Sequence, residues 1–241
     1  MRTTGTRPTM RLLIAMTVVL QAVVCHARAQ EPFFPELVFL PQNKDVNSII
    51  DDMTTVHLRA MREPSLWKLS QKDPGARAYR FLWLASNEHP ICLRLTRAGG
   101  AFVLHVAGHD GPPGVTAGRP TLSKDVKLTD QQGERLVGLL ERTVFWASPV
   151  EVKESRGIAD GDRIVIDGVK EGKYHVISRA GSASGESYKA FCRFLLELAD
   201  EPGVLKAWDR FRQAERKSPR YRPEPPQTED RGDPEPDAEA P

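Results

Sequence analysis

The chain has 241 residues, of which 40% are hydrophobic and 27% are charged, and its formal net charge is +2. This length and composition fit one globular domain with polar ends. Neither the balance of charge nor the composition singles out nucleic acid, and no nucleic-acid partner is expected.

The amino terminus has the form of a secretory signal peptide. Three arginines precede an apolar run from Leu12 to Val24, and residues 27–29, Ala-Arg-Ala, have the small-x-small pattern of a signal peptidase site. We therefore expect a signal peptide over residues 1–29, a mature chain that begins at Gln30, and a periplasmic or secreted protein.

Two other interpretations of this segment stay open. A single membrane span would need roughly 20 apolar residues, and the run is shorter, so no stable span is expected after cleavage. Lipid attachment at Cys25 would require Gly, Ala or Ser before it, where this chain has Val24.

Export leaves Cys92 and Cys192 in a compartment that permits disulfides. Each cysteine also lies in an apolar pattern, Cys92 in a predicted strand and Cys192 on the apolar stripe of a predicted helix. Two buried thiols are slightly favoured over a bridge.

The first half of the domain begins with helices. Residues 30–47 have no clear period and predict an irregular lead-in. Residues 48–61 have helical spacing, with Asn47 or Ser48 as the cap and Asp51 and Asp52 in the first turn. Pro64 ends this helix, and Ser65 caps another helical turn.

Three predicted strands follow, over residues 79–85, 91–97 and 102–107. Their connections are short, and parallel pairs would need crossovers of a dozen or more residues, so the strands predict an antiparallel meander. The glycines and prolines of residues 108–120 predict a long irregular loop.

The second half contains a helix capped by Thr129, a hairpin of residues 163–167 and 173–179, a helix from Ser184 to Ala199 and a terminal amphipathic segment. We predict an α+β fold with a small antiparallel sheet, meander plus later hairpin, and helices packed on one face. The single domain spans residues 48–216, and the proline-rich, acidic residues 217–241 predict a disordered tail.

Several segments together resemble a group of uncharacterised exported bacterial proteins. They are Glu-Pro-Ser-Leu-Trp at 63–67, Tyr-Arg-Phe-Leu-Trp-Leu at 79–84 and Gly-Lys-Tyr-His-Val-Ile-Ser-Arg at 172–179. The resemblance covers roughly residues 63–199 and implies no activity, cofactor or active-site assignment.

The sequence lacks the signatures of common reactions. No Gly-x-Ser-x-Gly elbow accompanies the serines near His175, and Ser184 is needed as a helix cap. His105, His109 and Asp110 could approach one another, but the last two open a Gly/Pro loop, so no metal site is expected. No glycine-rich phosphate loop is present, and no cofactor is expected.

The best polar cluster comes from strand alternation. In simple register Arg80, Arg94 and His105 share one face of the meander, and His175 and Arg179 of the hairpin extend it. Such a face predicts binding of an anionic ligand or an acidic protein segment. The alternative is that these residues are solvated, or that the arginines pair with Glu88 or Asp167.

Two functions remain open at this point. The first is a non-enzymatic binding or envelope-associated interaction module. The second is a periplasmic enzyme with a site near Asp167, Tyr174 and His175. Tyr174 and His175 must occupy opposite faces of their strand, and we expect Tyr174 to pack under the helix of residues 184–199, leaving His175 outside.

Overall fold

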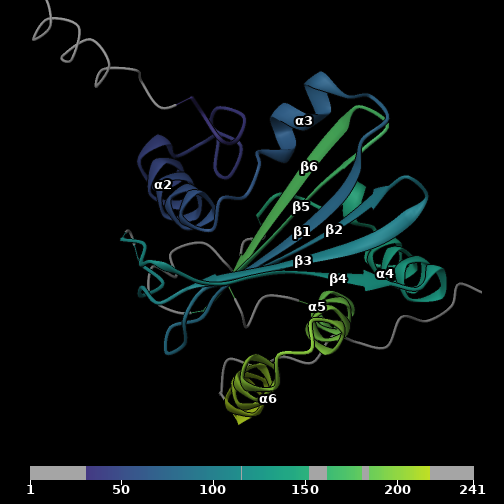
Figure 1. Cartoon of the computed structure of the whole chain (residues 1–241). Helices are drawn as coiled ribbons and strands as arrows, with labels where there is room; N and C mark the ends of the chain where they lie inside the picture. The colour runs from purple at the N-terminus through teal and green to yellow at the C-terminus, as the bar shows by residue number, and fades with distance from the viewer. Residues whose placement is uncertain (1–30, 115, 152–161, 181–184, 218–241) are drawn as a thin grey trace, which may run out of the picture.

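The computed structural model describes residues 31–114, 116–151, 162–180 and 185–217 (Figure 1). The predicted signal peptide, Cys25, Ser184 and the acidic tail beyond Lys217 lie outside these residues. The N-cap of the helix at residues 186–198 is Gly185, so the predicted Ser184 cap is wrong. Within them the order is α2 (Lys44–Ala60), α3 (Leu66–Lys72), β1 (Arg77–Leu84), β2 (Ile91–Ala98), β3 (Ala101–His109), β4 (Pro120–Leu128), α4 (Asp130–Glu141), a 3₁₀ turn (Phe145–Ala147), β5 (Arg163–Lys170), β6 (Lys173–Ala180), α5 (Glu186–Leu198) and α6 (Pro202–Lys217).

The six strands form one antiparallel sheet in the order β4-β3-β2-β1-β5-β6. The meander β1–β4 and the hairpin β5–β6 join through the β1–β5 pair, which places the hairpin beside the first strand of the meander. The predicted α+β class is therefore confirmed.

Helices cover both faces of the sheet, so the prediction of helices on one face is wrong in that detail (Figure 1). Strand β1 is buried on both sides because its alternate residues enter different cores. Phe81 and Trp83 pack with α4, α5 and α6, while Leu82 and Leu84 pack with α2 and the residues before it. The chain thus forms three layers, helix–sheet–helix.

The α4 side holds the larger core. Thr129 caps α4 as predicted, and it forms a complete capping box with Gln132. In α6, Trp208 is 1% exposed, and its ring meets that of Trp83 at a centroid distance of 5.2 Å. The terminal amphipathic segment is therefore part of the domain.

The α2 side is built largely by the residues predicted as an irregular lead-in. Phe33, Phe34 and Phe39 are buried there although they belong to no helix or strand. Helix α2 begins at Lys44 rather than at residue 48, with Asn43 as its cap. Asn47 is buried instead, and its Oδ1 accepts hydrogen bonds from the amides of Phe39 and Leu40, both at 2.9 Å.

Strand β4 was missed. It is an edge strand whose residues at positions 121, 123, 125 and 127 are exposed, so it lacks a strong apolar alternation. The predicted loop is consequently shorter, because His109 still belongs to β3 and Pro120 already belongs to β4.

Cys92 and Cys192 are free and fully buried, in agreement with the favoured interpretation. They belong to different cores, Cys92 on the α2 side and Cys192 on the α4 side, so the sheet separates them. Among the described residues no helix is long and apolar enough to cross a membrane.

Candidate functional site

A row of charged residues crosses the α2 side of the sheet. Arg80 lies directly opposite both Arg94 and Asp167, and Arg94 lies opposite His105. Asp125 on β4 completes the row opposite His105. Directly opposite residues share a face, so the predicted grouping of Arg80, Arg94 and His105 is present.

Arg80 and Asp167 form a buried ion pair at the centre of the row. The Arg80 Nε and one terminal nitrogen donate to the two Asp167 oxygens at 2.9 and 2.6 Å, and the side chains are only 1% and 2% exposed. The other terminal nitrogen donates to the Pro64 carbonyl at 2.7 Å. Burial lowers the pKa of Arg80, but the Asp167 and Glu63 carboxylates and the other nearby groups together outweigh burial and raise that pKa, so the guanidinium stays charged.

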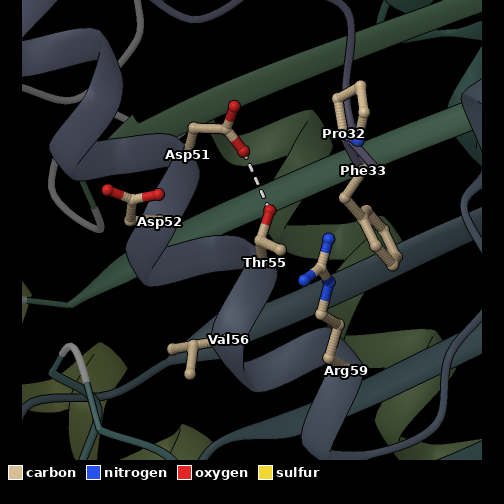
Figure 2. Close-up of a pocket in the computed structure, with 7 residues that line it drawn as sticks. All are labelled: Pro32, Phe33, Asp51, Asp52, Thr55, Val56 and Arg59. Atoms are coloured by element: carbon tan, nitrogen blue, oxygen red, sulfur yellow. Dashed lines mark hydrogen bonds between the residues drawn. The ribbon is translucent and has the colours of Figure 1, made fainter. Parts of the chain in front are cut away.

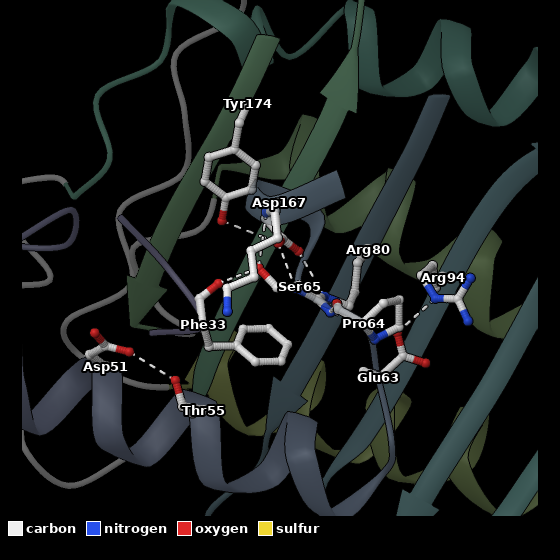
Figure 3. Close-up of polar contacts among 11 residues, drawn as sticks. Phe33, Asp51, Thr55, Glu63, Pro64, Ser65, Arg80, Arg94, Asp167 and Tyr174 are labelled. Atoms are coloured by element: carbon white, nitrogen blue, oxygen red, sulfur yellow. Dashed lines mark hydrogen bonds and ion pairs between the residues drawn. The ribbon is translucent and has the colours of Figure 1, made fainter. Parts of the chain in front are cut away.

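Glu63, from the connection between α2 and α3, lies over the row (Figure 3). Its Oε2 accepts a hydrogen bond from Arg94 Nε at 2.7 Å and lies 3.7 Å from an Arg80 nitrogen. Its Oε1 has no hydrogen-bond partner in the described part of the chain, and His105 Nε2 lies 3.6 Å from it. One buried carboxylate thus faces all three predicted residues.

Arg94 and His105 form the accessible end of this network, with 20% of each side chain exposed. His105 Nδ1 lies 2.7 Å from an oxygen of Asp125. Arg94 uses its Nε for Glu63, and neither of its two terminal nitrogens contacts a hydrogen-bond acceptor among the described residues.

His175 and Arg179 do not extend the row, because they lie on the opposite face of β6. His175 packs against Phe145 at a ring distance of 5.0 Å, and its Nε2 bonds to the Ser148 carbonyl at 2.9 Å. Burial lowers the pKa of His175. Arg179 donates to the carbonyls of Pro149 and Val150, both at 2.6 Å.

Tyr174 occupies the other face of β6, as strand alternation requires, but the predicted face was wrong. It packs on the α2 and α3 side, where its hydroxyl donates to Asp167 Oδ2 at 3.2 Å. His175 therefore faces the α5 side and is half-buried rather than exposed. Asp167 and Tyr174 come together, whereas His175 is separated from them by the sheet.

A groove of about 490 Å³ lies between α2 and the residues before it (Figure 2). Asp51, Asp52, Thr55 and Arg59 line its α2 wall, opposite Phe33. Thr55 donates to Asp51 at 2.8 Å, and burial raises the pKa of Asp51. From the sequence, Asp51 and Asp52 were expected in the first turn of the helix, near its positive end. The helix begins earlier than predicted, so both aspartates lie further along it, where they line this groove.

A second feature missed from the sequence is a buried histidine pair, His57 on α2 and His109 at the end of β3. The two ring planes lie within 15° of each other and meet edge to edge, with centroids 4.9 Å apart and His57 Nδ1 2.7 Å from His109 Nε2. His109 Nδ1 accepts the amides of Gly111 and Gly118, and His57 Nε2 meets the Gly114 carbonyl at 2.7 Å. Every ring nitrogen is satisfied if both rings are neutral.

His105, His109 and Asp110 do not form a group. His105 pairs with Asp125, His109 pairs with His57, and Asp110 Oδ1 accepts the Arg119 amide at 2.7 Å. No cluster of three or more potential metal-ligating side chains occurs among the described residues.

Comparison with known proteins adds no family. No family model matches the chain, and no curated protein matches it either. The functional assignment therefore rests on the geometry.

Proposed function

We propose that the protein is an exported, non-enzymatic binding module that recognises an acidic segment of a partner protein through Arg94. The observation that carries the proposal is the geometry of this side chain. Its Nε is held by the buried Glu63 carboxylate at 2.7 Å, while its terminal nitrogens have no acceptor in the described structure.

An arginine held in this way is prepared for bidentate recognition. The two terminal N–H groups of a guanidinium form a fork that matches the two oxygens of a carboxylate. Because Glu63 already fixes the plane of the guanidinium, a ligand would lose less side-chain entropy on binding than it would at a freely rotating arginine.

The surroundings of Arg94 suit a protein segment better than an enclosed small molecule. The neighbouring strands present His105 and Val103 from β3, and exposed Asp125 and Lys127 from β4, on the same open face. This face is polar and carries both signs of charge. A segment with one well-placed carboxylate would meet Arg94 there, with Lys127 as a second cation.

The placement of the residues considered for catalysis supports binding over chemistry. Both oxygens of Asp167 are occupied by Arg80, and burial holds the pKa of Tyr174 well above its usual value. His175 is on the far side of the sheet from both. General acid–base catalysis needs such groups within hydrogen-bond reach of one reacting centre.

The test uses the mature chain and a hexaglutamate peptide as the probe, with binding measured by isothermal titration calorimetry. Arg94→Ala should weaken binding about tenfold or more, because a charged hydrogen bond contributes roughly 1.5–3 kcal/mol. Arg94→Lys should rescue little, because an ammonium offers no fork.

The matched control is Arg97→Ala, three residues along the same strand. Arg97 points to the α4 side, where it pairs with Glu134 at 3.1 Å and stacks on Phe102. If Arg94→Ala and Arg97→Ala lose the same affinity for hexaglutamate, binding depends only on net charge, and the proposal is overturned. Turnover in a broad hydrolase panel that is abolished by Asp167→Asn would also overturn it. Export itself is tested by fractionating cells that express the full chain.

A further inference from the structure

A second row of cations crosses the sheet on the α4 side, at the hairpin end. Arg77 lies directly opposite Lys170, and Lys170 lies directly opposite Lys173. We infer that Lys170 and Lys173 of this row form, with Trp146 and His175, a binding site for a small organic anion, a phosphorylated or carboxylated molecule with a planar apolar body. This site is independent of the proposed function, because it lies on the other face of the sheet from Arg94.

The first reason is electrostatic. Like charges directly opposite each other in a sheet are destabilising, and here three occupy consecutive strands. The hairpin turn enforces the arrangement, since Glu171 and Gly172 both have positive φ, 53° and 70°, and so hold Lys170 and Lys173 opposite each other. A bound anion would relieve this repulsion.

The protein supplies little countercharge to the row. Lys170 Nζ lies 3.6 Å from Glu141 of α4, whose side chain is 52% exposed. Glu171 in the turn is the other nearby carboxylate, and it is exposed. Lys173 forms no ion pair with any residue in the described part of the chain. Three cations therefore face two carboxylates, both of which are accessible to water.

The second reason is a pocket of about 420 Å³ that includes both lysines. This volume falls in the range of small-molecule sites. Trp146 and His175 supply ring walls that are tilted by 40° to each other. His175 Nε2 donates to the Ser148 carbonyl, so its Nδ1 is left as an acceptor in the neutral ring. A ligand with a planar apolar body would stack on Trp146 and place its anionic group beside the two lysines.

The experiment compares three probes, inorganic phosphate, phenyl phosphate and benzoate, by calorimetry and by the shift in thermal unfolding temperature of the mature protein. Phenyl phosphate should bind saturably at millimolar or lower concentration and at least threefold more tightly than inorganic phosphate, because inorganic phosphate has no ring to stack on Trp146. The response to benzoate assigns the anionic group, since binding equal to that of phenyl phosphate indicates a carboxylate and weaker binding a phosphoryl group.

The exposed Lys173 is the residue to change, because its replacement does not disturb the core. Lys173→Ala should weaken phenyl phosphate binding at least fivefold and abolish its thermal shift, while the ligand-free protein melts at the same temperature or higher. Lys127→Ala, an exposed lysine on the other face, and Arg94→Ala should both leave this binding unchanged. No saturable binding, equal affinity for phosphate and phenyl phosphate, or equal losses in Lys173→Ala and Lys127→Ala would each overturn the inference.

Discussion

The buried pair of Arg80 and Asp167 makes the sharpest stability prediction. Asp167→Ala removes both acceptors of a guanidinium that is 1% exposed and leaves it with the Pro64 carbonyl and with Glu63 at 3.7 Å. Breaking a buried ion pair in this way costs about 3–5 kcal/mol. Glu63 remains as a partial partner, so we expect a loss near 3–4 kcal/mol. For a domain of this size that loss lowers the melting temperature by roughly 6–15 °C.

The matched control is Asp125→Ala, at the other end of the same row. Asp125 also faces a basic partner, His105 at 2.7 Å, but its side chain is 66% exposed. Exposed ion pairs contribute about 0–1 kcal/mol, so this variant should unfold almost as the wild type does. Urea unfolding followed by circular dichroism measures both.

A double variant separates lost pairing from lost packing. Arg80→Met with Asp167→Leu removes both charges and keeps apolar volume, so it should recover most of the stability that Asp167→Ala loses. An Asp167→Ala variant that loses no more stability than Asp125→Ala, or a double variant less stable than Asp167→Ala, would contradict this prediction.

Two further outcomes follow from local geometry. In α4, Gly133→Ala should destabilise the protein by about 1–3 kcal/mol, because a Cβ there overlaps the buried Phe102 ring. Gly138→Ala should stabilise the protein by about 0.5–1 kcal/mol, because only the Arg142 side chain lies near that position. Thermal unfolding of the two variants tests both expectations. Burial beside His57 and near His89 lowers the pKa of His109 to about 4, although Asp110 opposes the shift. Between about pH 6.5 and 4 the unfolded chain therefore binds a proton that the folded chain does not, and stability should fall by about 3 kcal/mol as the pH drops through this window. His109→Gln should remove that part of the pH dependence of the urea midpoint, and an unchanged slope would contradict it.

The charged row could be predicted because it depends only on strand alternation and short turns. The turns between β1, β2 and β3 allow little freedom in register, so Arg80, Arg94 and His105 had to align. Their partner Glu63 could not be predicted. It lies in a connection between two helices, and its position depends on how those helices dock on the sheet.

The face chosen for Tyr174 was wrong for a related reason. Alternation requires that Tyr174 and His175 diverge, but it does not say which side each takes. Choosing the side required knowing that the α2 face is also covered. Phe33, Phe34 and Phe39 cover part of it without any periodic pattern, so the sequence offered no signal for a second core there.

The polar network explains how an irregular lead-in and two helices come to dock in one position. Apolar contacts alone allow a layer to slide over a sheet, whereas Glu63 and the Pro64 carbonyl must meet Arg80 and Arg94 at fixed points. A displaced layer would leave Arg80 buried with fewer partners, which is costly. The Glu63 carboxylate also holds the Nε of Arg94, so the position of this partly exposed side chain is fixed by the docked helical layer. Docking of the layer and readiness of the proposed binding residue are therefore set by one group of hydrogen bonds.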